Sequence, residues 1–245
     1  PCSRFEYITF ARAMASIRLW AKVLAAALYS KFNQEFYDRI SPIYDQCFVT
    51  HKVHASNITK ILRERYKGIE KDTLVLDLGC GTGLLSNTLL GKGFEVLGAD
   101  ISLESLRLLQ QRESRINTLQ ADATQLPFAD GSFHAVASLG AWRHFPDPRK
   151  VIAEVARILK DDGLLIVGYF PPAIGGVVHQ GDSHWRQMLV RLYQFLIRKR
   201  GYVDHIDLSL EPMTVDWAKD YFEQVSTVDS GKRWRLIIAR GPRQA

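Results

Sequence analysis

Leu74-Val-Leu-Asp-Leu-Gly-Cys-Gly-Thr-Gly83 is the stretch that decides the fold of this 245-residue chain. Its aliphatic first half predicts a short strand buried on both faces, and three glycines at alternate positions follow directly. Glycine has no Cβ, so the backbone of such a loop can pass close beneath a ligand. In open α/β sheets, ligands bind beyond the carboxyl ends of the strands, where this loop is expected. The loop therefore predicts a nucleotide-like ligand, with a tight strand-to-helix turn as the alternative.

Short aliphatic runs alternate with amphipathic stretches downstream of the glycine loop. The runs predict strands and the stretches between them predict helices, which gives repeated strand-helix-strand units. Such units place parallel strands side by side with helices on both faces, so we expect a doubly wound sheet. Asp161-Asp-Gly163 is expected to end the last of these helices and lead into the fifth strand. The expected strands are 74–78, 94–99, 116–120, 133–139 and 164–169, and the expected helices are 84–90, 103–112 and 149–159.

The chain after residue 170 departs from this alternation. Pro171-Pro172 breaks the pattern, and a basic helix is expected at 185–200, so this region is interpreted as a lid insertion. A short helix at 215–222 and two strands at 223–229 and 233–240 then follow. Gly231-Lys232 suits the tight turn of an antiparallel hairpin between those strands.

Four parts result from this pattern. An N-terminal helical cover (1–70) precedes the ligand-binding α/β core (71–170), and the lid (171–211) precedes the C-terminal completion of the sheet (212–245). The predicted fold class is α/β, with a Rossmann-like, doubly wound, seven-stranded sheet. That sheet is mostly parallel and ends in an antiparallel C-terminal hairpin strand.

The spacing of the glycines excludes two common nucleotide motifs. A dinucleotide fingerprint starting at Gly79 needs a third glycine where Leu84 stands, and one starting at Gly81 needs Gly or Ala where Ser86 stands. A P-loop needs G-K-[ST] at the start of the helix, and this loop lacks it. NAD and P-loop nucleotides are therefore not the expected ligands.

Two acids follow the next two expected strands. Asp100 stands roughly 20 residues after the first glycine, where a carboxylate can accept hydrogen bonds from both ribose hydroxyls. Its alternative role is to cap the next helix, although Ser102 can provide that cap. Asp122 can accept from an adenine amino group while the amide of Ala123 faces a ring nitrogen. A surface turn is the alternative for Asp122.

Together, the segment from Val75 to Gly83, the acids Asp100 and Asp122, and Leu126-Pro-Phe-Ala-Asp-Gly-Ser-Phe133 resemble the successive motifs of class I S-adenosylmethionine-dependent methyltransferases. The resemblance runs from about residue 74 to residue 169. It implies S-adenosyl-L-methionine as cofactor and S-adenosyl-L-homocysteine as product. By this resemblance the glycine loop carries the methionine part, the first acid takes the ribose and the second lies by the adenine. The implied cofactor set is Asp77, Gly79, Cys80, Gly81, Gly83, Asp100, Ile101, Asp122, Ala123 and Ser138.

Asp77 has two interpretations within that set. The resemblance places it near the amino group of the methionine part, and a buried acid that only holds the loop is the alternative. A narrower resemblance links segments 36–45, 138–147 and 155–163 to the ubiquinone/menaquinone C-methyltransferase group, also known as methyltransferase type 11. This chain has His144 where that group usually has asparagine, and residues 171–211 match the group poorly. A quinone acceptor is therefore not carried over from the resemblance.

Methyl transfer from a sulfonium is an in-line displacement, so a protein mainly aligns the reactants and excludes water. A carbon or phenol nucleophile must also lose a proton, which a base with a near-neutral pKa assists. His144, beyond the fourth strand, is the candidate base, with lining the pocket as its alternative. Tyr44 is the second candidate, because the N-terminal segment tends to close over the cofactor in the resembled family. Trp142 and Arg143 are weaker candidates for the pocket wall, and no metal-ligand spacing is present.

The composition is that of an ordinary globular protein, with 47% hydrophobic and 24% charged residues and a formal charge of +6. Much of the basic excess lies in segments 1–35 and 185–200, whose pattern suits amphipathic helices at a membrane surface. Helices with a solvated basic face are the alternative. Nucleic acid is not the expected partner, because few aromatic residues accompany the basic ones. Three cysteines without a C-x-x-C motif fit a cytoplasmic setting, either free or peripheral to a membrane.

The sequence thus predicts a methyltransferase that acts on a small hydrophobic or aromatic acceptor, either quinol-like or natural-product-like. A non-methylating protein on the same fold, such as a scaffold or a cyclase-type catalyst, is the first alternative. An RNA methyltransferase is the second, and it would show salt-dependent RNA binding. The oligomeric state and the acceptor atom do not follow from the sequence.

Overall fold

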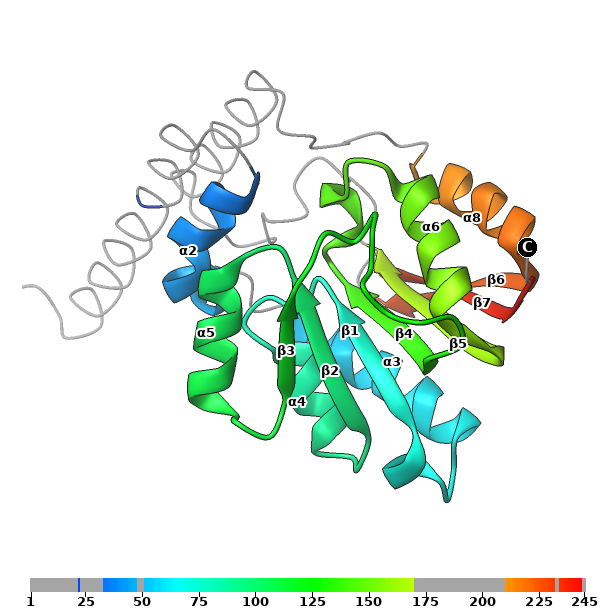
Figure 1. Cartoon of the computed structure of the whole chain (residues 1–245), viewed down its shortest axis with the longest axis horizontal. Coiled ribbons are helices and arrows are strands. Elements are labelled where there is room, and N and C mark those ends of the chain that lie inside the picture. Colours follow the sequence, from blue (N-terminus) through cyan, green and yellow to red (C-terminus); the bar gives the residue numbers. More distant parts are fainter. Residues whose placement is uncertain (1–21, 23–32, 48–50, 170–209, 232–233, 244–245) are drawn as a thin grey trace, which may run out of the picture.

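The computed structural model describes residues 22, 33–47, 51–169, 210–231 and 234–243 (Figure 1). The described strands form one seven-stranded sheet with the order β3-β2-β1-β4-β5-β7-β6. All neighbouring strands are parallel except β7, which pairs antiparallel with both β5 and β6. The predicted fold class is confirmed. The strands are β1 (Leu74–Leu78), β2 (Glu95–Asp100), β3 (Asn117–Gln120), β4 (Phe133–Leu139), β5 (Leu159–Tyr169), β6 (Phe222–Gly231) and β7 (Trp234–Pro242).

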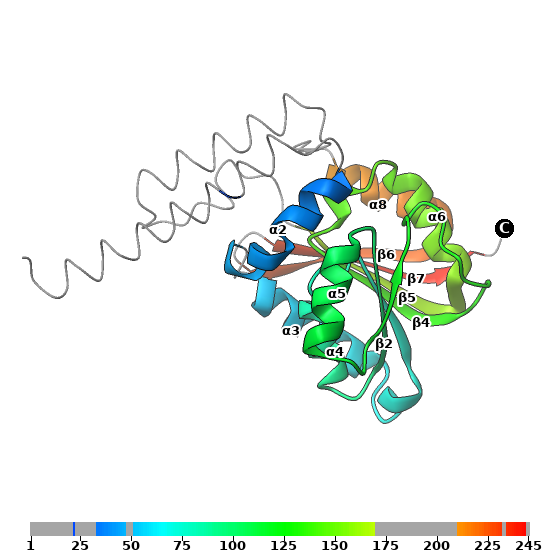
Figure 2. The same ribbon diagram turned by 60° about the vertical axis from the view of Figure 1, so that its left-hand side comes forward.

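Helices cover both faces of the sheet (Figures 1 and 2). Val75 and Leu76 are neighbours in β1 and therefore point to opposite faces. Val75 joins the core beneath α3, α4 and α5, whereas Leu76 joins the core beneath α6 and α8. α2 lies at the carboxyl-end edge of the sheet, beside α5. The helices are α2 (Asn33–Cys47), α3 (His51–Arg65), α4 (Leu84–Leu90), α5 (Leu103–Arg112), α6 (Pro148–Ile158) and α8 (Leu210–Tyr221), with 3-10 turns η1 (Glu70–Asp72) and η2 (Trp142–His144).

The junction of α6 and β5 corrects one expectation. The helix ends at Ile158 and the strand begins at once with Leu159, so Asp161-Asp-Gly163 lies inside β5. The pairing is irregular there, because the partners advance from Phe133 to Ala135 on β4 but from Leu159 to Leu164 on β5. A Cβ on Gly163 would lie 2.7 Å from the Lys160 carbonyl oxygen, so this bulge needs a glycine. The buried Ile158 and Leu159 bring the chain into the sheet before the polar residues.

The C-terminal part also differs in detail. α8 begins at Leu210, earlier than expected, because Pro212 fits within the first turn of a helix. β6 and β7 pair as far as Gly231 with Trp234, which confirms the hairpin, although Lys232 lies outside the described residues. The expected helices at 1–35 (apart from its last residues) and 185–200, and the lid between Pro171 and residue 209, also lie outside them.

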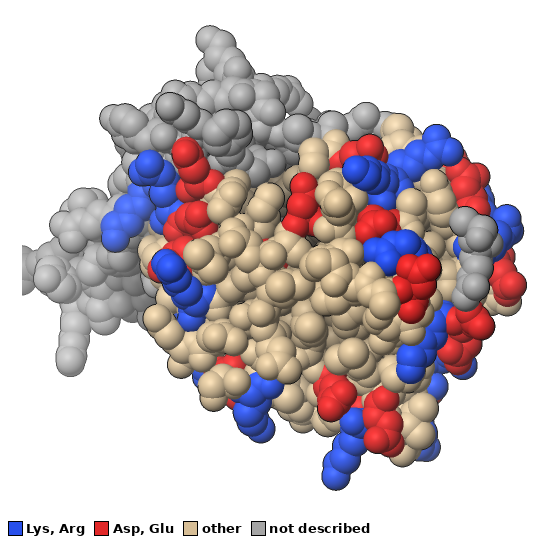
Figure 3. Space-filling model, in the orientation of Figure 1, with Lys and Arg blue, Asp and Glu red and all other residues tan. Residues whose placement is uncertain are grey.

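The described part of the chain has no helix that is long and apolar enough to span a membrane. On the face of the molecule shown in Figure 3, basic and acidic side chains are interspersed around a largely uncharged centre. That face therefore presents no continuous single-sign patch.

Candidate functional site

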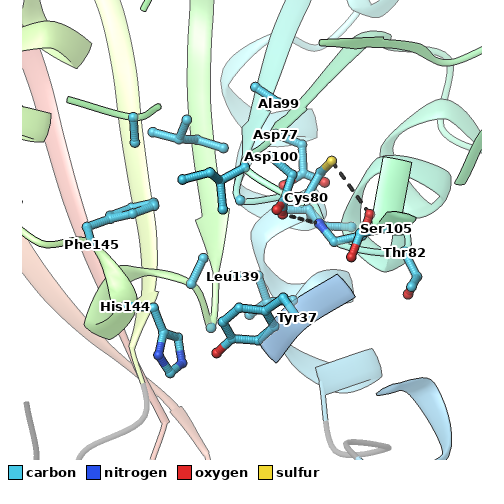
Figure 4. A pocket seen from close by; sticks show the side chains of 18 of the residues that line it. Tyr37, Asp77, Cys80, Thr82, Ala99, Asp100, Ser105, Leu139, His144 and Phe145 are labelled. Atoms are coloured by element: carbon cyan, nitrogen blue, oxygen red, sulfur yellow. Dashed lines mark hydrogen bonds between the residues drawn. The ribbon is translucent and has the colours of Figure 1, made fainter. Parts of the chain in front are cut away.

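A cavity of about 400 Å³ lies at the carboxyl ends of β1, β2 and β4. The glycine loop forms its floor, the loop after β3 and the segment after β4 form two sides, and α2 closes over it (Figure 4). This is the position that the strand order predicts for a ligand. The residues that line it are Gln34, Tyr37, Tyr44, Asp45, Asp77, Leu78, Gly79, Cys80, Gly81, Thr82, Leu84, Leu85, Ala99, Asp100, Ile101, Ser105, Ala121, Asp122, Ala123, Leu139, Gly140, Ala141, His144, Phe145 and Pro146.

The glycine loop uses its glycines for two different purposes. Gly79 and Gly83 both have a positive φ, of 73° and 90°. A Cβ on Gly79 would lie 2.3 Å from the Cβ of Ala141, so the loop packs directly on the segment that leads to η2. A Cβ on Gly83 would lie 2.2 Å from Leu109, so that glycine lets α4 approach α5. Gly83 does not line the cavity, and its role is packing rather than the expected cofactor contact.

Asp100 organises the loop as well as the end of β2. Its Oδ2 accepts a hydrogen bond from the Gly81 amide at 2.8 Å, and its Oδ1 accepts one from the Ser102 amide at 2.9 Å. Ser102 caps α5 with its own side chain, as expected. Burial raises the pKa of Asp100. Because each carboxylate oxygen has two lone pairs, Asp100 retains one on each oxygen for a pair of ribose hydroxyls.

Asp122 combines its two predicted roles. Its Oδ1 accepts from both the amide and the hydroxyl of Thr124, each at 2.8 Å, which is the surface turn named as its alternative. It also lines the cavity, next to the buried Ala123. The turn therefore fixes the carboxylate at the rim of the cavity, and its second oxygen accepts nothing from the described residues.

Asp77 lies behind the glycine loop. It is buried, its Oδ2 accepts from the Ser86 hydroxyl at 2.6 Å, and one side of it reaches the cavity. Burial raises the pKa of Asp77 to about 7. A cationic group placed beside it would favour its charged form, so this acid suits both the loop-holding role and the role near an amino group.

Cys80 and Ile101 line the cavity with uncharged surface. Burial raises the pKa of the Cys80 thiol well above its usual value, so the thiol stays protonated. Ile101 is 42% exposed at the rim, and its carbonyl oxygen accepts from the side-chain amide of Gln120 at 3.0 Å. Both residues therefore add apolar surface to the wall of the cavity.

Aromatic rings form the opposite end of the cavity (Figure 4). The ring of Tyr37 meets the ring of His144 edge-on at 5.3 Å, and the ring of Tyr44 lies 6.4 Å from that of Tyr37. Burial, with a smaller contribution from Arg143, lowers the pKa of His144 to about 3. His144 is therefore neutral at physiological pH and a weak proton acceptor. This corrects the expectation of a base with a near-neutral pKa and favours the pocket-lining alternative.

Besides Gly83, three described residues singled out from the sequence do not reach the cavity. Ser138 is fully buried in β4 with its hydroxyl unpaired, so its expected cofactor contact is not supported. Trp142 is 1% exposed and belongs to the core, where its indole donates to the Thr214 hydroxyl at 3.2 Å. Arg143 neighbours the cavity in sequence without lining it. The sequence also offers His179, His184 and Trp185 of the predicted lid as weaker candidates for the site, and these residues lie outside the described ones.

The cavity also contains residues that the sequence did not single out. Thr82 stands inside the glycine segment, so its position could have been noted there. Ser105 and Phe145 line the cavity because of how α5 and η2 pack, and no local sequence pattern predicts that packing. The charged side chains among the described lining residues are all carboxylates: Asp45, Asp77, Asp100 and Asp122. Such a set favours a ligand with net positive charge at its centre.

Residues 76–167 match the family model described as "Methyltransferase domain". This segment is therefore similar to methyltransferase domains. Demethylmenaquinone methyltransferase from Renibacterium salmoninarum is 34% identical over 141 residues, which are 55% of this chain and 56% of that protein. The match thus spans little more than half the length of the protein from Renibacterium salmoninarum.

Solved structures have the same fold as the chain. The PH0226 protein from Pyrococcus horikoshii has a TM-score of 0.56 and 25% identity, covering 82% of this chain and 98% of that one. Phosphoethanolamine N-methyltransferase 2 from Haemonchus contortus, in complex with S-adenosyl-L-methionine, has a TM-score of 0.52 and 17% identity. That match covers 76% of this chain and 53% of the other. At these identities the similarity shows the fold alone.

Proposed function

We propose that the chain binds S-adenosyl-L-methionine in the cavity and transfers its methyl group to a small acceptor. The observation that carries the proposal is the placement of Asp100, Asp122 and the glycine loop around one cavity, in a segment similar to methyltransferase domains. Asp100 also accepts from backbone amides, and Asp122 also holds a turn, but both carboxylates can still accept further hydrogen bonds.

The residues present fit this cofactor. A sulfonium and an ammonium outweigh one carboxylate in S-adenosylmethionine, and the charged groups lining the cavity are carboxylates in the described part of the chain. The volume of about 400 Å³ is within the range of small-molecule pockets. Asp100 would hold the ribose, Asp122 and Ala123 the adenine, and Asp77 with Gly79 and Gly81 the methionine part.

When bound, the cofactor supplies a sulfonium methyl group that is open to in-line displacement. The residues of the chain bind it from the floor of the cavity and leave the aromatic end for the acceptor. Tyr37, Tyr44 and His144 exclude water there and restrict the orientation of a flat acceptor. Alignment of this kind can lower a barrier by about 7 to 11 kcal/mol. The neutral His144 can accept a hydrogen bond from the acceptor, which orients it without removing its proton outright.

A hydrophobic or aromatic acceptor, quinol-like or natural-product-like, agrees best with this arrangement. Aromatic rings from α2 and η2 line the end of the cavity away from the three acids Asp77, Asp100 and Asp122. The relative from Renibacterium salmoninarum is named for demethylmenaquinone, which supports a quinol-like acceptor for this chain. The proposed acceptor thus follows from the aromatic lining of the cavity and from the similarity to a demethylmenaquinone methyltransferase.

The proposal is tested in two steps with the full chain. Isothermal titration calorimetry with S-adenosylmethionine is expected to show one site per chain. Incubation with labelled S-adenosylmethionine and a reduced short-chain demethylmenaquinone, or a lipid-soluble metabolite extract, is then expected to give a labelled product. Binding without transfer to any acceptor would support a non-methylating protein on the same fold. Absence of binding would contradict the whole proposal.

A further inference from the structure

Three polar side chains on one face of α2, Asp38, Ser41 and Asp45, contact α5 and the glycine loop, in addition to the buried apolar side chains of the helix. The Oδ1 of Asp38 accepts from the Ser102 hydroxyl at 2.6 Å and from the Glu104 amide at 3.2 Å. These contacts add a second acceptor to the N-terminus of α5, next to its own cap. We call these three side chains the α2 clasp; its first contact is with Ser102, the residue that caps α5.

The middle of the clasp is buried. The hydroxyls of Ser41 and Ser105 are 2.6 Å apart, and Ser105 is one of the residues that line the cavity. Ser41 also donates to the backbone carbonyl of Tyr37 at 2.6 Å. Since that hydroxyl proton is used within α2, Ser105 is the donor in the pair. One face of α2 therefore contacts α5, and Tyr37 and Tyr44 on the adjacent face line the cavity.

Asp45 closes the clasp and contacts two elements that are far apart in the sequence. Its Oδ1 accepts from the hydroxyl of Thr82 in the glycine loop, and its Oδ2 accepts from the guanidinium of Arg112 at the end of α5. The side chains of Asp45 and Arg112 are 46% and 45% exposed, so the ion pair alone contributes little to stability. Thr82 is largely buried, so its hydroxyl would lose its partner among the described residues if the bond to Asp45 were lost.

We propose that Asp45 is a positioning residue for the cofactor: by accepting from Thr82 and Arg112 it fixes α2 and the glycine loop in the one arrangement that encloses the ligand. The inference rests on the proposed function and adds to it the residue that couples the N-terminal helix to the loop. Thr82 stands directly after Gly81, whose amide holds Asp100. A shift of Thr82 therefore moves the floor of the cavity, and a shift of α2 moves its cover.

The consequence is a linkage between helix docking and affinity. If a ligand binds only when α2 is docked, its apparent Kd equals the intrinsic Kd divided by the fraction of molecules in which α2 is docked. Loss of the Thr82 bond should therefore lower affinity for S-adenosylmethionine more than it lowers stability. A role limited to holding the fold together would do the reverse.

Two substitutions at Thr82 separate the hydroxyl from the shape of the side chain. Thr82→Val keeps the shape and loses the hydroxyl, whereas Thr82→Ser keeps the hydroxyl and loses a methyl group. We expect Thr82→Val to raise the Kd for S-adenosylmethionine about 10-fold and Thr82→Ser to raise it less than about 3-fold. Asp45→Asn, at a half-exposed site where folding is not at risk, should raise it by about 5-fold. In the double variant the two effects should be less than additive, because both substitutions act on the hydrogen bond between Thr82 and Asp45.

Thr88→Val is the matched control. The Thr88 hydroxyl donates to the Leu84 carbonyl at 2.8 Å within α4, away from the cavity, so the same change there should leave the Kd unaltered. Thermal unfolding of each variant is measured alongside. Wild-type affinity in both Thr82→Val and Asp45→Asn, or an equal loss in Thr82→Ser and Thr82→Val, would overturn the positioning role. Failure of the wild-type chain to bind S-adenosylmethionine would instead contradict the proposed function.

Discussion

The two ends of the parallel strands carry similar polar groups that are used in different ways. At the amino end, His134 is surrounded by partners: its Nδ1 accepts from the Leu74 amide at 3.0 Å, and its Nε2 lies 2.8 Å from Lys160 Nζ. Its backbone carbonyl accepts from the Tyr66 hydroxyl at 2.6 Å. At the carboxyl end, Asp100 and Asp122 have partners as well, but each also faces a cavity with acceptor capacity to spare.

The difference shows how a structural polar group is told apart from a binding one. Hydrogen bonds by themselves do not decide, since both ends have them. Remaining acceptor capacity next to a cavity does decide, because only that capacity is available to a ligand. Substitutions at the carboxyl end should therefore act on binding, and substitutions at the amino end should act on stability.

The largest effect is expected for Asp100→Asn. The amide has one oxygen in place of two, so it cannot hold the Gly81 amide, the Ser102 amide and two ribose hydroxyls together. We expect the Kd for S-adenosylmethionine to rise on the order of 100-fold, as for the loss of one or two charge-assisted bonds. Calorimetry provides the Kd, and unfolding in urea checks the fold. An affinity within about 3-fold of wild type would remove Asp100 from the ribose site.

The next effect concerns Gly83, the glycine of the loop that serves packing rather than binding. Gly83→Ala combines a φ of 90° with a Cβ 2.2 Å from Leu109, and we expect a loss of about 2 kcal/mol in the free energy of unfolding. Gly68→Ala is the matched control, because its φ is 88° and no atom lies within 4 Å of the added Cβ. It should cost about 1 kcal/mol. Equal losses would show that the close approach of α4 to α5 is not what requires Gly83.

A smaller effect is expected at the amino end. His134→Leu leaves the Leu74 amide without its acceptor, which should lower the free energy of unfolding by about 1 to 2 kcal/mol. The Kd for S-adenosylmethionine should not change, because the cavity lies at the opposite end of the strands. A variant as stable as wild type but with weakened cofactor binding would break the distinction between the two ends.

The smallest effect is a pH dependence that both histidines share. Burial lowers the pKa of His134 and of His144 in the folded state, to about 3 for His144. The unfolded chain then binds more protons, so these groups contribute stability above about pH 6.5 that is lost as the pH falls toward 3. Because both rings are partly exposed, the slope should be well under 1.4 kcal/mol per pH unit.

Urea unfolding at pH 7.5 and pH 5.5 measures this slope, with His144→Gln and His134→Gln as the variants. The difference between the two pH values should be smaller in each variant than in wild type. A larger difference in either variant would mean that the histidine is stabilised in its charged form.

Most of the fold follows from the sequence because its signals are local. The buried run Leu74–Leu78 and the helix at Leu84–Leu90 have the predicted bounds, since aliphatic period and glycine position decide both. The bulge in β5 was not predicted, because Asp161-Asp-Gly163 has the composition of a turn and only the burial of Leu159 places it in a strand.

The site was predictable where one residue type at one position carries the signal. Asp100 after its strand is such a case. The α2 clasp is not, because the partners of Asp45 lie in the glycine loop and at the end of α5, and Asp38, Ser41 and Asp45 resemble an ordinary solvated helix face. The sequence identified His144 as a site residue. It did not predict the lowered pKa of His144, because the burial that causes it depends on the packing of Tyr37 and η2 around the ring.

A crystal structure of the full chain with S-adenosylhomocysteine tests the central claim most directly, since that claim is about spare acceptors at the carboxyl ends of the strands. The account predicts the two ribose hydroxyls within hydrogen-bond distance of Asp100, the adenine beside Asp122 and Ala123, and the homocysteine part over the glycine loop. Density for the ligand elsewhere, or in the cavity with the ribose away from Asp100, would contradict it.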